Sequence, residues 1–438
     1  MSATARAWWF VALLCFASLL SVIDRGVLNL VVDPVRSELH LSEVQMSLLM
    51  GLAFGFVYAI GGVALGAVAD RYNRRNLIIF GIAVWSLATF AAGLARDFSE
   101  LFAARLVVGL GEAALAPAAV SLIADLFAPD RRGRPMGLYM TGQAIANGLA
   151  ITLIGVVIAA AAAHRFDGLL ASLALQANLS AWRVTFMLCG VCGVALILLL
   201  CTCREAPRGA PSTTPTMLAQ GRETLRHLIE RWRFFLPLYL GFASCFMAAY
   251  GAASWTPTML GRVYGLGPVQ LAQILGPLAI IFAAAGPLLG SFFLDPLVKR
   301  FGDHGRLLLV AAVTLLAIPS GLAVLAVKGP VAALLVASSS AVYPLVGLCV
   351  ITTLQSQWPA RMRGVGIALT GLFNTVIGQV CGPLFIAALT QHLFKDPKSV
   401  GWSIALVIVP ALLFAIAMFL VAARSISQPA VSANRVPA

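Results

Sequence analysis

The chain contains 438 residues, of which 60% are hydrophobic and only 11% are charged. A soluble globular domain carries about 25% charged residues, so this composition excludes a protein built around a soluble core. The net charge of +13 does not indicate a nucleic-acid partner, because the basic residues are spread over many short loops and do not gather in one segment.

Apolar residues recur in runs of about twenty, the length that spans a hydrocarbon core of about 30 Å. Backbone groups in lipid must be satisfied within their own segment, so each run is predicted to be a helix. We therefore expect an all-α polytopic membrane protein with twelve transmembrane helices. The predicted spans are 8–32, 46–69, 76–95, 101–126, 136–160, 182–202, 234–256, 270–294, 307–327, 330–355, 364–390 and 400–423.

The loops on one side of these spans hold most of the 30 basic residues. By the positive-inside rule, this distribution places both termini in the cytoplasm and predicts a multi-pass protein of the cell inner (plasma) membrane. The eight cysteines lie mostly within apolar runs and do not suggest a disulfide framework. Neither a metal ion nor another cofactor is expected.

The first span carries Asp24 and Arg25, and the fourth carries Arg105 and Glu112. A charged side chain at the centre of a membrane helix costs about 2.5–3.5 kcal/mol, so these four residues are candidates for the working centre. The alternative is that Asp24 and Arg25 form a pair at the outer interface whose side chains extend to water.

The second span ends in GAVADRYNRRN, residues 66–76. This stretch resembles the loop between helices 2 and 3 of the major facilitator superfamily. Asn73 replaces the glycine usual in that loop, a mild departure because asparagine also tolerates positive φ. The resemblance implies a conformational latch between two six-helix halves, to which we also assign an arginine at the start of the fifth span. The latch residues are Gly66, Asp70, Arg71, Arg74, Arg75 and Arg134.

The fourth span also resembles a superfamily motif, because Arg105, Gly109, Gly111 and Pro117 match its helix-4 pattern. The resemblance implies that Arg105 takes part in proton coupling. Burial disfavours the ionised form of a carboxyl group, whereas a nearby arginine favours it. We therefore predict that Asp24 and Glu112 exchange protons and arginine partners, Arg25 and Arg105, as access to the two membrane faces alternates.

Two pairs of similar segments, one in each half of the sequence, indicate that the chain arose by duplication. The clearest joins Arg134, Gly137, Thr141 and Gly142 to Arg363, Gly366, Thr370 and Gly371, each 229 positions later. Such a repeat predicts two pseudo-symmetric halves, as in the major facilitator fold. The expected units are an N-terminal six-helix bundle (1–202), a cytoplasmic linker with an amphipathic helix (203–233), a C-terminal six-helix bundle (234–423) and a cytoplasmic tail (424–438).

The second half contains no clearly buried charge in its spans, so the central cavity is predicted to be charged on one side and mostly apolar on the other. Such a cavity suits an amphiphile whose headgroup lies at the arginines. The candidate cavity residues are Tyr58, Tyr139, Gln143, Asn147, Ser244, Tyr250, Tyr343 and Asn374.

Stretches within the first 150 residues or so, including 24–54 and 105–127, resemble the bacterial spinster branch of the superfamily. The resemblance implies proton-coupled transport of a lysolipid or sphingoid lipid. The alternative is a proton symporter for a small aromatic or carboxylate anion. An enzyme is not expected, because the chain contains neither HExxH nor GxSxG. The expected partners are the substrate, protons and the bilayer, and a single chain is expected to function as a monomer.

Overall fold

The computed structural model describes residues 3–69, 71–128, 130–168, 179–205, 217–359 and 362–426. Within these ranges the chain is helical, and twelve helices are long and apolar enough to cross a membrane. The predicted all-α fold with twelve spans is therefore confirmed.

The first bundle is built from residues before the linker. Its elements are α1 (Ala3–Leu30), α2 (Val32–Glu38), α3 (Glu43–Ser47), the π-helical segment η1 (Leu48–Leu52), α4 (Ala53–Ala69), α5 (Arg74–Ala92), α6 (Phe98–Glu112), α7 (Leu115–Leu126), α8 (Gly133–Ala162) and α10 (Ala181–Cys201). The elements α3, η1 and α4 form one span, and α6 and α7 form another.

The second bundle follows the linker helix α11 (Met217–Glu230). It contains α12 (Trp232–Tyr264), α13 (Pro268–Leu315), α14 (Ile318–Gly321), η2 (Ala323–Leu325), α15 (Gly329–Ser338), η3 (Ser339–Ala341), α16 (Val342–Gln357), α17 (Arg363–Phe373), η5 (Asn374–Cys381), α18 (Gly382–Ala388), η6 (Leu389–Phe394), η7 (Pro397–Ser399) and α19 (Val400–Ser425). The predicted span 270–294 lies within α13, and the predicted span 307–327 begins in α13 and continues through α14 and η2. The helical geometry of α13 is interrupted between these two spans at Gly302, where φ is 59°.

Polar residues begin several helices by capping their free N–H groups. Ser42 and Gln45 form a reciprocal capping box at the start of α3, with hydrogen bonds of 2.8 and 3.1 Å. The Asn73 side chain accepts a hydrogen bond of 2.8 Å from the Asn76 N–H at the start of α5. Asn73 has a φ of −60°, so it replaces the expected glycine as a helix cap and not as a residue of positive φ.

Glycines allow the two bundles to approach closely along α8 and α13. A Cβ atom placed on Gly148 would lie 2.6 Å from the Gly276 carbonyl oxygen, and one on Gly155 would lie 2.1 Å from the Ala272 Cβ. Small residues serve this purpose in membrane helices because lipid gives no hydrophobic drive for association. The contact between α8 and α13 therefore depends on the absence of side chains at these positions.

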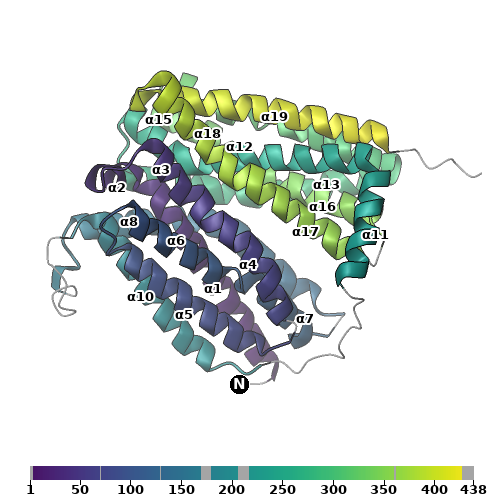
Figure 1. Ribbon diagram of the computed structural model, residues 1–438, viewed down its shortest axis with the longest axis horizontal. Helices are drawn as coiled ribbons and strands as arrows, with labels where there is room; N and C mark the ends of the chain where they lie inside the picture. The colour runs from purple at the N-terminus through teal and green to yellow at the C-terminus, as the bar shows by residue number, and fades with distance from the viewer. Residues whose placement is uncertain are drawn as a thin grey trace, which may run out of the picture.

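The bundles meet at the end of the molecule that carries α2 and α3, and they diverge toward the end that carries α7, α11 and α17 (Figure 1). We call these ends the closed side and the open side. The chain enters α1 and leaves α19 on the open side, where the linker helix α11 extends from α12.

An ion cluster joins the bundles on the closed side. Arg262, at the end of α12, lies 2.6 Å from an Asp33 carboxylate oxygen and 2.9 Å from a Glu43 carboxylate oxygen in the first bundle. The Arg262 side chain is 8% exposed and the Glu43 side chain 3% exposed, so water screens this contact poorly. Two further hydrogen bonds cross the same interface, from Ser47 Oγ to the Pro383 oxygen (2.8 Å) and from Val44 N to Gln391 Oε1 (3.1 Å).

We predict that Arg262→Ala shifts the protein toward states in which the closed side is open. The substitution leaves the buried Glu43 without the guanidinium of the other bundle, and the balance should move roughly tenfold or more, equivalent to about 1.4 kcal/mol. Spin labels at exposed Ser37 and Val327, introduced through an unnatural amino acid, report the separation across this side.

The matched control is Arg183→Ala, which removes an ion pair of 2.6 Å with Glu38 inside the first bundle. The control should leave the distance between the labels unchanged. Equal distances in Arg262→Ala and the unsubstituted protein would contradict the assignment of Arg262 to closure.

Candidate functional site

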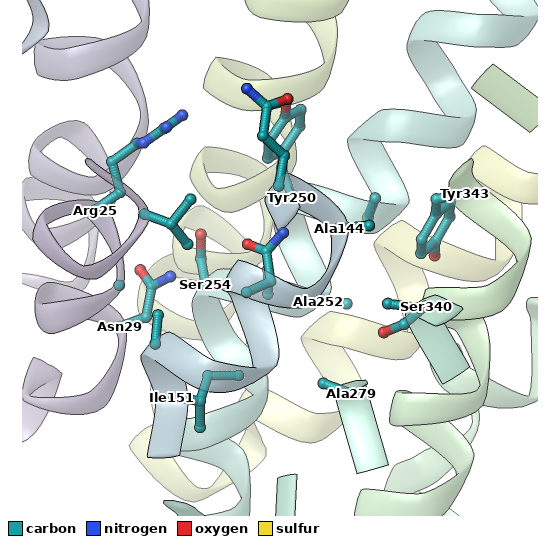
Figure 2. A pocket seen from close by; sticks show the side chains of 18 of the residues that line it. Arg25, Asn29, Ala144, Ile151, Tyr250, Ala252, Ser254, Ala279, Ser340 and Tyr343 are labelled. Atoms are coloured by element: carbon teal, nitrogen blue, oxygen red, sulfur yellow. The ribbon is translucent and has the colours of Figure 1, made fainter. Parts of the chain in front are cut away.

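A cavity of about 620 Å³ lies between the bundles and is lined by residues of both. Figure 2 shows Arg25 and Asn29 of α1 on one side of it, with Ser340 and Tyr343 on the opposite side. Arg25 and Glu112 are the charged residues among those that line the cavity in the described part of the chain.

Arg25 and Glu112 form an ion pair in the cavity wall. The Arg25 Nε lies 3.2 Å from Glu112 Oε2, and the same oxygen accepts a hydrogen bond of 2.6 Å from the Ser21 hydroxyl. The Glu112 side chain is fully buried, whereas the Arg25 side chain is 37% exposed toward the cavity. Glu112 Oε1 has no hydrogen-bond partner among the described residues. Glu112 Oε2 thus has a hydrogen-bond donor and an ion-pair partner, whereas Oε1 has no hydrogen-bond partner among the described residues.

Asp24 and Arg105 lie behind this pair, inside the first bundle. The Thr89 hydroxyl of α5 donates a hydrogen bond of 2.9 Å to Asp24 Oδ2. Arg105 Nη1 donates to the Asp24 backbone carbonyl oxygen at 3.3 Å. Asp24 is 3% exposed and Arg105 is 1% exposed, so the alternative of an interfacial pair reaching toward water is wrong for Asp24.

The partners of these four residues differ in part from the predicted exchange. Arg25 pairs with Glu112, as the exchange requires, but Arg105 forms no ion pair with an acidic side chain of the described residues. Its guanidinium carbon instead lies 5.5 Å from the centre of the Phe54 ring. The sequence could not reveal this contact, because Phe54 is one of many apolar residues of the second span.

Most of the candidate cavity residues line the cavity. These are Tyr58, Tyr139, Gln143, Asn147, Tyr250 and Tyr343. Ser244 is buried but does not line it, because it lies about 120° around the α12 axis from Tyr250. Asn374 also does not line it, since its side-chain oxygen is directed along its own helix toward Gly378.

Several lining residues escaped the sequence analysis. Asn29 lies one helical turn after Arg25 and therefore shares its face, so helical spacing alone could have identified it. Gln379 could not be identified in this way, because it lies in the π-helical segment η5, where the α-helical period does not apply.

The latch arginines Arg74 and Arg75 contact the first bundle and the start of the linker. Arg74, which is buried, forms ion pairs with Asp125 and with Glu205, the latter at 2.8 Å. Arg75 donates to the Leu200 and Cys201 carbonyl oxygens at 3.1 and 3.0 Å.

Of the remaining latch residues, those that the structure describes lie on the surface or against the first bundle. Arg71 and Arg134 are exposed, Gly66 lies near Pro117 in the same bundle, and Asp70 lies outside the described residues. The bundles diverge on this side, and the contacts of Arg74 and Arg75 given above do not join them.

Twelve apolar helices in two bundles around a shared cavity with a buried ion pair define a multi-pass membrane transporter. The chain belongs to the Major Facilitator Superfamily, whose model matches residues 14–383.

Similar proteins agree with this assignment. The chain is 26% identical to an MFS-type efflux pump of Mycolicibacterium smegmatis over 96% of its own length and 93% of the relative. It is 25% identical to Protein spinster of Drosophila melanogaster over 92% of its own length and 66% of the fly protein.

A solved structure extends the likeness to three dimensions. The crystal structure of a bacterial homologue of the human lysosomal transporter spinster, in an inward-facing and unoccupied conformation, matches with a TM-score of 0.79. The sequences are 25% identical, and the match covers 98% of this chain and 100% of that one. The spinster resemblance of the sequence is thus confirmed.

We predict that Gly109→Ala destabilises the first bundle. A Cβ atom at Gly109 would lie 2.6 Å from the Phe54 backbone oxygen, so α4 and α6 would have to move apart at a cost of about 1–3 kcal/mol. The midpoint of thermal unfolding of the purified protein should fall. The control is Gly62→Ala in α4, where no atom lies within 4 Å of the new methyl group. Equal unfolding midpoints for the two variants would contradict the close packing of α4 and α6.

Proposed function

We propose that the protein is a proton-coupled secondary transporter that moves an amphiphile, such as a lysolipid or sphingoid lipid, by alternating access. The observation that carries this proposal is the Arg25–Glu112 ion pair in the cavity wall. The protein would lie in the cell inner membrane with both termini and the open side in the cytoplasm, as the distribution of basic residues indicates.

The free oxygen of Glu112 supplies a place for the proton. Ser21 and Arg25 occupy Oε2, so a proton can bind to Oε1 without breaking the hydrogen bond from Ser21. Protonation removes the negative charge opposite Arg25 and leaves its guanidinium free to bind an anionic headgroup. Deprotonation restores the ion pair and competes with the substrate for the same cation.

Asp24 is the candidate for a second proton site. Its carboxylate is buried and accepts a hydrogen bond from Thr89, and it lies behind the cavity wall. A proton that leaves Glu112 could thus remain within the first bundle. Arg105, which contacts the Asp24 backbone, would keep positive charge near both carboxylates.

The two walls of the cavity favour an amphiphile over a small hydrophilic solute. The first bundle contributes Ser21, Arg25, Asn29 and Glu112 to one wall. Among the described residues, the second bundle contributes no charged side chain to the cavity. Its lining combines apolar side chains, including Leu275, Ala279, Val336 and Phe246, with the polar groups of Tyr250, Ser254, Ser340, Tyr343 and Gln379. A headgroup can therefore contact polar side chains while an acyl chain is removed from water.

A symporter for a small organic anion is the second candidate. Amide and hydroxyl groups of Gln143, Asn147 and Tyr139 also line the cavity and could bind a hydroxylated anion beside Arg25. The chain is 27% identical to a probable L-galactonate transporter of Escherichia coli over 66% of its own length and 61% of the relative. One chain supplies the whole cavity wall in either case, so a monomer would suffice.

Purified protein in liposomes that contain a trapped pH-sensitive dye tests the proposal. Addition of oleoyl lysophosphatidic acid should drive proton movement into the lumen, whereas L-galactonate should not. Glu112→Gln should remove the proton movement and Asp24→Asn should reduce it, because each substitution deletes a titratable carboxyl group. Glu100→Gln, at an exposed carboxylate of the same helix α6, serves as the control.

If L-galactonate drives proton movement and oleoyl lysophosphatidic acid does not, the substrate is a small organic anion and not an amphiphile. Proton movement that survives in both Glu112→Gln and Asp24→Asn would overturn the coupling mechanism.

A further inference from the structure

One aromatic ring contacts both arginines of the site. The guanidinium carbon of Arg25 lies 5.2 Å from the centre of the Phe54 ring, and that of Arg105 lies 5.5 Å from the same centre. Both distances fall within the range in which a cation is attracted to the face of an aromatic ring. Phe54 and Arg105 are each 1% exposed, so water weakens their attraction little, whereas the Arg25 side chain is 37% exposed to the cavity.

Arg105 depends on this ring more than Arg25 does. Arg25 also binds Glu112 and the Ser21 hydroxyl, at 3.2 and 2.7 Å. Arg105 has a single hydrogen bond of 3.3 Å to a backbone oxygen, and its Nε is buried without a partner in the described part of the chain. A buried cation with so few donors satisfied needs further stabilisation. The nearby carboxylates of Glu112 and Asp24 supply part of it, and the face of the Phe54 ring lies against the guanidinium.

The position of Phe54 also connects the cavity to the interior of the first bundle. Its ring stacks on Tyr58 with centres 5.2 Å apart, and Tyr58 lines the cavity. Arg25 lies in the cavity wall, whereas Arg105 lies behind it. The Phe54 ring therefore lies beside both the cavity-facing guanidinium of Arg25 and the buried guanidinium of Arg105.

The helix that carries Phe54 touches the other bundle. A Cβ atom on Gly51 would lie 2.7 Å from the Gln379 backbone oxygen, and one on Gly55 would lie 3.0 Å from the Gln379 side chain. Gln379 belongs to η5 of the second bundle and lines the cavity. A change in the position of either arginine can thus reach the interface between the bundles through a single helix.

We infer that Phe54 is a positioning residue for proton coupling, whose ring holds the guanidinium groups of Arg25 and Arg105 in place and links the cavity ion pair to α4. This inference rests on the proposed function. The attraction comes from the negative electrostatic potential of the ring face. A ring of the same shape with a less negative face should therefore hold the two guanidinium groups less firmly.

Several helices contribute titratable or charged groups near Glu112, Arg25 and Arg105, and together these groups set the pH at which Glu112 binds a proton. Glu112 carries the free oxygen, and the neighbouring titratable or charged groups come from α1, α4, α6, α10 and α12. These are Asp24, Arg25, Tyr58, Arg105, Cys189, Cys192 and Tyr250.

A titration that needs no substrate tests the inference. Spin labels at Arg131 and Phe301, both exposed on the open side, report how far the bundles diverge as the pH changes. Phe54 is replaced by phenylalanine analogues with one, two or three ring fluorines, which weaken the negative face while keeping the shape. The midpoint of the pH-dependent distance change should move upward with each fluorine, by about 0.5 pH unit or more in total, because less firmly held cations favour the Glu112 carboxylate less.

The same analogues at Phe56, which is 52% exposed on the outer face of α4, provide the control and should leave the midpoint unchanged. Phe54→Tyr should retain the midpoint of the unsubstituted protein, and Phe54→Leu should move it. The unfolding temperature of each variant shows that it is folded, and the fluorinated proteins remain informative where Phe54→Leu does not fold.

The outcomes separate this inference from the proposed function. A midpoint that Glu112→Gln removes but that the fluorinated analogues do not move would overturn the role of Phe54 alone. Distances that do not depend on pH in the unsubstituted protein would contradict proton coupling, and the inference would fall with it.

Discussion

The site depends on one buried ion pair, in which the Glu112 carboxylate lies beside the Arg25 guanidinium in the wall of the cavity between the bundles. A lone charge in such a place would be very costly, and the contacts with Arg25 and Ser21 offset the cost of burying the Glu112 carboxylate. The rest of the first bundle serves this contact. Glycines at positions 109 and 111 bring α6 close to α4 and α5, and this approach places Glu112 next to α1. The tight packing of helices and the electrostatics of the cavity are therefore one constraint.

The arginines at the two ends of the molecule make different kinds of contact. On the closed side, Arg262 reaches from the second bundle to acidic residues of the first. On the open side, Arg74 binds Asp125 of its own bundle and Glu205 of the linker, and Arg75 binds the end of α10. Among the described residues, the ion pairs that join the halves lie on the closed side. The difference between two access states can then remain small, because changing state exchanges ion pairs and need not remove them.

Much of the fold could be predicted from the sequence, because its signals are local. Runs of apolar residues gave the twelve spans, and rare charges within them identified Asp24, Arg25, Arg105 and Glu112. Contacts between distant segments could not be predicted. Nothing near Arg262 in the sequence indicates that it binds Asp33, 229 residues away, and Phe54 is indistinguishable from other apolar residues of its span.

Helical face assignments failed for a related reason. Ser244 and Asn374 are polar residues of suitable spans, but the cavity lies on other faces of their helices. The rotation of a helix about its axis is decided by packing against its neighbours. A π-helical segment such as η5 also shifts the faces of the residues that follow it, and local sequence does not reveal that shift.

The π-helical segments η1 and η5 also meet each other, since Gly51 of the first lies against the backbone of Gln379 in the second. A π turn holds one residue more than an α turn, and a helix can absorb or release that residue without losing its hydrogen-bonded continuity. Two such turns in contact therefore place backbone of adjustable pitch at the interface between the bundles.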